Sequence, residues 1–264
     1  MKLGFIGTGN MASAIMGGII KNQIIPANDI IGADVMEAGR ERVKEQFKIQ
    51  ATADNHEVIN RSDIVILSVK PQFYAEVIAE IKDDVREDQI IITIAPGKTL
   101  AWLKEQFGKN VKIVRTMPNT PALVGAGMTA ACPNEYMTKE EIAYVLTLLE
   151  SFGRVEIIPE RLMDTVVSVS GSSPAYVFMF IEAMADAAVS GGMPRAQAYQ
   201  FAAQAVLGSA KMVLETGKHP GELKDMVCSP AGTTIEAVRV LEEKGFRSSV
   251  IEAMKTCEEI SKSM

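Results

Sequence analysis

A glycine-rich loop near the N-terminus has the spacing of a dinucleotide-binding turn. The segment "GFIGTGNMASA" (residues 4–14) places Gly7, Gly9 and Ala12 in a G-x-G-x-x-G/A pattern between an apolar run and a helical pattern. Gly7 allows a tight turn, Gly9 lets the backbone approach a pyrophosphate, and the amides at the helix start face the phosphates. The pattern therefore predicts that a dinucleotide binds here. The alternative is a glycine turn of purely structural use.

A carboxylate follows the next apolar run and bears on the choice of dinucleotide. Asp34 ends "DIIGAD" (residues 29–34), where an acidic side chain accepts hydrogen bonds from the adenine ribose and repels a 2′-phosphate. This position favours NADH. Arg40 and Arg42 follow on a helical pattern from which either can reach a 2′-phosphate, so NADPH or NADH both remain open. The alternative role for Asp34 is to cap the following helix.

Two more loops end later apolar runs, "SVKP" (residues 68–71) and "IAPG" (residues 94–97). Ligands bind at the carboxyl ends of the strands of a parallel sheet, so both loops are expected to line the cofactor. Lys70 is a candidate catalytic acid or ribose contact, and the alternative is an ordinary surface lysine.

The uncharged stretch Ser229 to Thr234, in "MVCSPAGTTIEAV", separates two helical patterns near the C-terminus. Its amides, at the start of a helix, are suited to an anion. Thr233 or Thr234 is expected to cap that helix, and Thr233 with Glu236 has the spacing of a capping box. The alternative is a helix cap without a ligand.

These loops need elements to position them, and the chain supplies two kinds. Strand and helix patterns alternate as far as Pro159, and apolar runs such as "IVIL" and "IIITI" suit strands that are covered on both faces. The predicted strands are 2–6, 29–34, 63–69, 89–95 and 111–117, with weaker ones at 128–131 and 155–158, and the predicted helices include 10–21, 36–47 and 73–81.

After Pro159 the patterns are helical, with breaks at 171, 191–194, 216–221, 229–234 and 245. The predicted fold class is α/β, an N-terminal Rossmann-type doubly wound parallel sheet followed by an all-α domain. The expected domains are residues 1–159 for the dinucleotide and residues 160–264 for dimerisation and substrate binding.

Composition narrows the function classes. A net charge of -6 without a long basic run argues against nucleic acid. The three cysteines and two histidines are scattered, so we expect no metal site, and free thiols indicate a reducing, cytoplasmic location. We also expect no signal peptide, because glycines interrupt the N-terminal apolar run.

The segment Pro174 to Ser190 is apolar nearly all round but carries Glu182 and Asp186. It falls short of the ~20 apolar residues of a membrane-spanning helix. A helix of this kind must be buried on every side, so we expect it to pack against a second subunit. The alternative is the central helix of a monomeric bundle.

Three segments resemble one family closely: "RTMPNTPALVGAGMTA" (115–130), "SGSSPAY" (170–176) and "SPAGTTIEAVRVLEEKGFR" (229–247). The chain resembles the pyrroline-5-carboxylate reductases over nearly its whole length. The resemblance implies NAD(P)H-dependent reduction of the cyclic imine 1-pyrroline-5-carboxylate to L-proline, the last step of proline biosynthesis. It also implies a homodimer through the C-terminal helices, with assembly of dimers into decamers in some members.

Carried over by position, the resemblance implies two sets of site residues. The cofactor set is Gly7, Thr8, Gly9, Asn10, Met11, Asn55, Leu67, Ser68, Val69, Lys70, Ile94, Ala95 and Pro96, to which the spacing argument adds Asp34. The substrate set is Ser229, Ala231, Gly232, Thr233 and Thr234. The family often has glycine where Ser173 and Ala231 stand here.

Thr234 resembles the family threonine that hydrogen-bonds the ring nitrogen, and it is the candidate catalytic residue. A protonated imine already attracts hydride, so positioning is expected to be the main catalytic effect. If the all-α domains of two subunits interlock, the substrate loop is expected to come from the partner chain.

Two other functions remain as alternatives. One is a different NAD(P)H-dependent imine or hydroxyacid reductase, but β-hydroxyacid dehydrogenases rely on a lysine in a G-x-x-G-x-x-x-K motif, and "SGSSPAYVFMF" has none. The other is a non-catalytic NAD(P)H sensor, against which the intact substrate loop argues.

Overall fold

The computed structural model describes residues 1–263, which form two compact units. The first comprises Met1–Ser172 and the C-terminal segment that begins at Cys257, and the second comprises Ser173–Thr256. Each is described by itself. The boundary between these units lies after Ser172 and not at the predicted residue 159. The assignment of residues 1–159 to the dinucleotide and of residues 160–264 to dimerisation and substrate binding stays a prediction.

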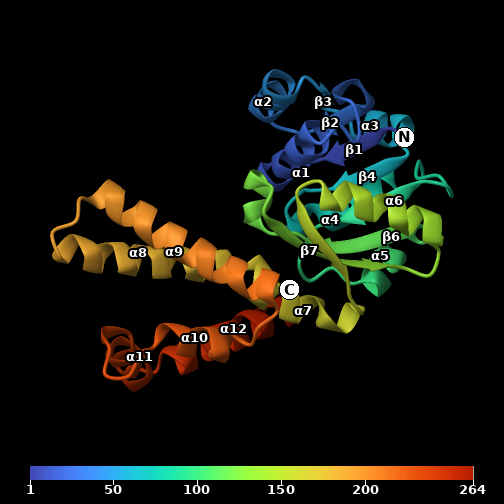
Figure 1. Cartoon of the computed structure of the whole chain (residues 1–264). Coiled ribbons are helices and arrows are strands. Elements are labelled where there is room, and N and C mark those ends of the chain that lie inside the picture. Colours follow the sequence, from blue (N-terminus) through green and yellow to red (C-terminus); the bar gives the residue numbers. More distant parts are fainter. Residues whose placement is uncertain (264) are drawn as a thin grey trace. The chain divides into compact units, whose positions relative to one another are not determined.

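An eight-stranded sheet in the order β3-β2-β1-β4-β5-β6-β7-β8 forms the centre of the first unit (Figure 1). Its strands are β1 (Leu3–Ile6), β2 (Ile30–Ala33), β3 (Gln50–Thr52), β4 (Ile64–Leu67), β5 (Ile90–Thr93), β6 (Lys112–Met117), β7 (Gly127–Pro133) and β8 (Gly153–Ile157). All neighbouring pairs are parallel except β6 and β7. The predicted α/β class and doubly wound sheet are confirmed.

Helices cover the sheet of the first unit. They are α1 (Asn10–Lys21), α2 (Glu37–Phe47), α3 (Asn55–Arg61), α4 (Tyr74–Ile81), α5 (Leu100–Phe107), α6 (Lys139–Glu150) and α7 (Met163–Val166). Short 3-10 turns occupy Ala27–Asp29, Pro71–Phe73, Thr120–Val124 and Glu160–Leu162, and a π-helical turn occupies Val167–Gly171.

Two apolar clusters lie on opposite faces of this sheet, because successive strand residues point in opposite directions. In β4, Ile64 and Ile66 belong to one cluster and Val65 and Leu67 to the other. All four are fully or almost fully buried, so the unbroken apolar run reflects burial on both faces.

Helices make up the second unit. They are α8 (Ser173–Ser190), α9 (Arg195–Thr216), α10 (Pro220–Val227), α11 (Thr233–Glu243) and the greater part of α12 (Phe246–Lys262). The breaks between them lie where the sequence predicts. Pro194, at the end of the predicted break 191–194, is the N-cap of α9 and lies just before its first turn.

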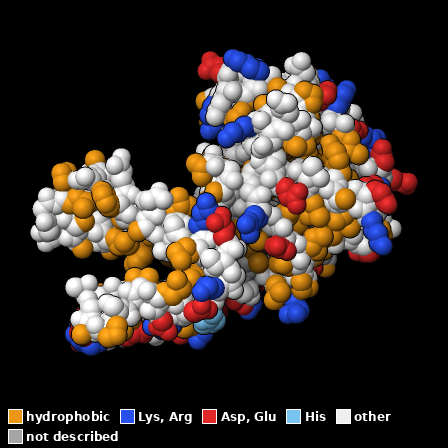
Figure 2. Space-filling view, viewed as in Figure 1, with side chains coloured by type: hydrophobic (Ala, Val, Ile, Leu, Met, Phe, Trp, Pro, Cys, Tyr) orange, Lys and Arg blue, Asp and Glu red, His pale blue; other side chains and the backbone are white. Residues whose placement is uncertain are grey.

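Apolar side chains of the second unit are widely exposed in the single chain (Figure 2). Phe178 and Met179 of α8 are 62% and 68% exposed, and Phe201 of α9 is 61% exposed. Among the described residues, the stretch Glu160–Ser190 is long and apolar enough by length and composition to cross a membrane, and core helices of soluble proteins pass the same test. Only 6% of its apolar window is buried, so the expected burial is not provided within one chain.

Candidate functional site

A pocket of about 390 Å³ lies at the carboxyl ends of the parallel strands. It is lined by Ile6, Gly7, Gly9, Ala33, Asp34, Val35, Asn55, Ser68, Val69, Lys70, Phe73, Glu76, Val77 and Glu80. The structure therefore brings together the predicted residues that follow β1, β2 and β4 with the first residue of α3. This is the edge at which parallel sheets bind ligands.

Gly7 forms the turn that closes this edge. Its φ is +93°, and a Cβ atom there would lie 2.8 Å from the carbonyl carbon and oxygen of Ser68. The Ser68 hydroxyl donates to the Gly7 carbonyl over 2.6 Å. Only glycine suits this backbone conformation and this close approach.

Gly9 meets a different environment. It precedes the first turn of α1 without a side-chain cap, and a Cβ atom there would have no neighbour within 4 Å. The amides at the start of α1 are therefore approachable, as a pyrophosphate requires.

Thr8 and Asp34 form the floor of the loop. The Thr8 amide and hydroxyl donate to Asp34 Oδ2, and the Met36 amide donates to Oδ1 over 2.9 Å. Partial burial acts to raise the pKa of Asp34, but these hydrogen bonds and the charge of Arg42 outweigh it and hold the pKa below its usual value. Asp34 is therefore ionised and fixed.

The two arginines after Asp34 hold the same turn. Arg40 Nη1 donates to the Asp34 carbonyl over 2.7 Å and to the Val35 carbonyl over 3.1 Å, and Arg42 donates to the Thr8 carbonyl. Cations and a carboxylate thus lie together beside the pocket.

Asn55 reaches the pocket from the first turn of α3. Its Nδ2 donates to Glu80 Oε2 over 2.9 Å, which directs this amide group toward α4. Glu80 was not predicted from the sequence, and neither were Phe73, Glu76 and Val77. Their i, i+3, i+4, i+7 spacing after the "SVKP" loop is the signal that marks one helix face.

Other predicted cofactor residues are not among those that line this pocket. Thr8 and Leu67 are fully buried, and Met11 packs partly against the core. Asn10 is exposed at the start of α1, while Ile94, Ala95 and Pro96 follow β5.

The predicted substrate residues lie in the turn between α10 and α11 and in the first turn of α11, in the second unit. Gly232 is the N-cap, and its amide donates to the Ser229 carbonyl over 3.0 Å. Ala231 has a φ of +57°, a left-handed conformation that costs an alanine about 1–2 kcal/mol. The glycine that the family often has at this position is explained by that conformation.

The predicted threonine cap is wrong. Thr233 and Thr234 are the first two residues inside α11, whose N-cap makes no side-chain hydrogen bond. The Glu236 side chain pairs with Arg239 instead of closing a capping box. The cap forms one residue earlier because the turn at Ala231 leaves Gly232 with an extended backbone.

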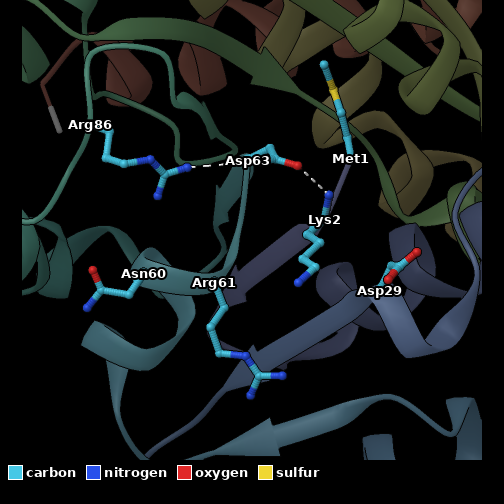
Figure 3. Close-up of a pocket in the computed structure, with 7 residues that line it drawn as sticks. All are labelled: Met1, Lys2, Asp29, Asn60, Arg61, Asp63 and Arg86. Atoms are coloured by element: carbon cyan, nitrogen blue, oxygen red, sulfur yellow. Dashed lines mark hydrogen bonds and ion pairs between the residues drawn. The ribbon is translucent and has the colours of Figure 1, made fainter.

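A second hollow, of about 540 Å³, lies at the opposite edge of the sheet, where the strands begin (Figure 3). It is lined by Met1, Lys2, Asp29, Asn60, Arg61, Asp63 and Arg86. The Lys2 amide donates to Asp63 over 2.7 Å, and Arg61 Nη1 donates to Glu57 over 2.7 Å. Within residues 1–263, no group of three or more His, Cys, Asp or Glu side chains could hold a metal ion.

Comparison with protein families matches both parts of the chain. Residues 160–264 match the family described as pyrroline-5-carboxylate reductase dimerisation. Residues 2–97 match the family described as NADP oxidoreductase, coenzyme F420-dependent.

Individual relatives cover the whole chain. A pyrroline-5-carboxylate reductase of Escherichia coli is 56% identical over 267 residues, covering 100% of this chain and 98% of the relative. A pyrroline carboxylate reductase of Plasmodium falciparum, solved with NADP bound, has a TM-score of 0.92 at 32% identity and covers 100% and 97%. The 1-pyrroline-5-carboxylate reductase of Streptococcus pyogenes has a TM-score of 0.90 at 34% identity and covers 100% and 99%. Because these alignments run through both the glycine loop and the turn before α11, the chain belongs to the pyrroline-5-carboxylate reductase family.

Proposed function

We propose that this protein reduces 1-pyrroline-5-carboxylate to L-proline with NADPH or NADH, as the last step of proline biosynthesis. The observation that carries the proposal is the full-length similarity to reductases of that name, which includes the glycine loop and the turn at 229–234.

The first unit would hold the cofactor, which when bound supplies the hydride that adds to the C=N carbon. The open start of α1, at Gly9, would hold the pyrophosphate. Asp34 would face the adenine ribose, and Asn55 and Lys70 would contact the rest of the nucleotide from the pocket wall. We propose that the other predicted cofactor residues also contact the dinucleotide: Gly7, Thr8, Asn10, Met11, Leu67, Ser68, Val69, Ile94, Ala95 and Pro96.

The turn before α11 would hold the substrate. The amides of Gly232, Thr233 and Thr234 lie at the positive end of an 11-residue helix, which suits the substrate carboxylate. The Thr234 hydroxyl, not used as a cap, would hydrogen-bond the ring nitrogen and orient the imine. Ser229 and Ala231 would shape the turn around the carboxylate.

The family is one of homo-oligomers that act on a small molecule. We propose a homodimer through α8 and the other C-terminal helices, because their exposed Phe178, Met179 and Phe201 need cover. The family resemblance also implies that dimers can assemble into a decamer, which sedimentation would test. We further propose a cytoplasmic location, with neither a membrane nor nucleic acid as a partner.

The assay is direct: the purified protein is given 1-pyrroline-5-carboxylate with NADPH or NADH, and nicotinamide absorbance and L-proline are measured. Loss of absorbance with formation of L-proline supports the proposal. NADPH binding without turnover would favour a sensor, and turnover only with a hydroxyacid and oxidised cofactor would favour the rival reductase. Sedimentation at assay concentration tests the dimer, and an active monomer would contradict it.

A further inference from the structure

The loop from Ile94 to Thr99, between β5 and α5, is held by a side chain at each end. At its start, the Ile94 amide donates to the Tyr74 hydroxyl over 3.3 Å. Just past its end, the Leu100 amide donates to Glu160 Oε1 over 2.7 Å. All of these residues belong to the first compact unit.

Tyr74 connects this loop to the loop after β4. Its side chain is fully buried, and its hydroxyl also donates to the carbonyl of Leu67. Burial raises the pKa of Tyr74, so the phenol keeps its proton and remains a donor. The Tyr74 hydroxyl therefore makes hydrogen bonds at the ends of both β4 and β5, where the two predicted cofactor loops begin.

Glu160 is itself fixed by a buried cation. Arg115 Nη1 of β6 donates to Glu160 Oε1 over 2.9 Å, and the Arg115 side chain is only 3% exposed. The Arg115 Nε atom is buried without a hydrogen-bond partner, so Glu160 is the principal compensation for this charge. The same carboxylate oxygen thus receives both the guanidinium and the first amide of α5.

We propose that Tyr74 and Glu160 are positioning residues that hold the Ile94–Thr99 loop in the shape that receives NADPH. The inference rests on the proposed function, which places Ile94, Ala95 and Pro96 at the cofactor. Small displacements of reacting groups reduce rates steeply, by roughly a hundredfold for about 1 Å. Glu160 is also the first residue matched by the dimerisation family, so the loop is held by the segment that leads into that region.

The test compares variants that remove or keep the hydrogen bond from the Ile94 amide to Tyr74 and the one from the Leu100 amide to Glu160. Tyr74→Phe removes only the hydroxyl, and Glu160→Ala removes the acceptor of the Leu100 amide. Glu160→Gln keeps an oxygen for that amide but loses the charge opposite Arg115. We expect Tyr74→Phe and Glu160→Ala to weaken NADPH binding and to lower kcat/KM for NADPH by roughly tenfold each. Glu160→Gln should lower the melting temperature as Glu160→Ala does, yet bind NADPH nearly as the parent does.

Gln89→Met is the matched control, because Gln89 is fully buried at the other end of β5. Its side-chain amide donates to the carbonyls of Ile59 and Ser62, each over 2.8 Å, at the edge away from the cofactor loops. It should lower the melting temperature without changing the Kd for NADPH.

NADPH binding is measured by calorimetry, apart from turnover, so failure of the imine assay would reject the proposed function without deciding this inference. If Tyr74→Phe and Glu160→Ala lowered the melting temperature but left both the Kd for NADPH and kcat/KM for NADPH unchanged, the positioning role would be overturned. An equal loss of NADPH affinity in Gln89→Met would overturn it as well.

Discussion

The amide and the hydroxyl of Thr8 both donate to Oδ2 of Asp34, over 2.9 and 2.8 Å. The glycine loop and the end of β2 are therefore joined through a single carboxylate oxygen. Because Asp34 is ionised and cannot turn away without breaking these bonds, its negative charge stays beside the pocket. We therefore expect this fixed charge to affect the preference between NADH and NADPH.

Replacing Asp34 with serine should shift cofactor preference toward NADPH. Removing a carboxylate removes its repulsion of the 2′-phosphate and leaves Arg40 and Arg42 nearby. We expect the ratio of kcat/KM for NADPH to that for NADH to rise roughly tenfold. Asp63→Ser, at the opposite edge of the sheet, is the control and should leave the ratio unchanged. An unaltered ratio in Asp34→Ser would mean that this carboxylate does not face the ribose.

Gly9→Val and Gly7→Val should fail in different ways. A side chain at Gly9 has open space around it, so the fold should survive while the pyrophosphate loses its approach to the backbone. A side chain at Gly7 would collide with Ser68 in a left-handed conformation, so this variant should unfold at a lower temperature. Calorimetric titration with NADPH and thermal melting separate the two. Parent-like NADPH affinity in Gly9→Val would refute the assignment of the loop.

Thr234→Ala should reduce catalysis with little effect on stability. Its hydroxyl makes no capping bond, and alanine is well tolerated inside a helix. Loss of a hydrogen bond to the ring nitrogen should lower kcat/KM for the imine about 10- to 100-fold. The Kd for NADPH should barely move.

Thr233→Ala is the control for Thr234→Ala, since it changes the neighbouring hydroxyl at the same helix start. The free energy of unfolding of both variants should lie within about 0.5 kcal/mol of that of the parent. Unchanged turnover in Thr234→Ala would remove its catalytic role.

Ala231→Gly should stabilise the protein. The φ of +57° costs alanine about 1–2 kcal/mol, whereas the greater freedom of glycine in the unfolded chain costs about 0.4–1 kcal/mol. The net gain in the free energy of unfolding, measured in denaturant, should lie between about 0 and about 1.6 kcal/mol. Ala126→Gly, in an exposed loop without positive φ, should instead be destabilising. Destabilisation by both variants would show that the turn is not strained at Ala231.

The strands whose burial is complete could be predicted from the sequence. β1, β4 and β5 consist almost entirely of apolar residues because both of their faces are covered. The glycine spacing after β1 predicted the edge of the sheet at which the pocket lies. The short strand β3, Gln50–Thr52, was missed, because only its pairing with β2 makes it a strand and none of its residues is fully buried.

The start of α11 could not be predicted from the sequence. Hydroxyls and spacing pointed to Thr233 as a cap, but the cap is Gly232, because the left-handed Ala231 places that residue just before the first turn. Local propensity cannot reveal a backbone conformation that the surrounding turn imposes.

The sequence by itself determined the class of fold and the family, and it predicted the glycine loop and the uncharged stretch 229–234 as binding loops. These features depend on composition and on spacing along the chain. Only the tertiary structure decided which groups meet across long separations. Tyr74 bridges Leu67 and Ile94, and Glu160 joins Arg115 to the start of α5. The physical reason is that a buried hydroxyl or ion needs a partner, and the packing of the sheet, not the order of residues, determines which partner lies within reach.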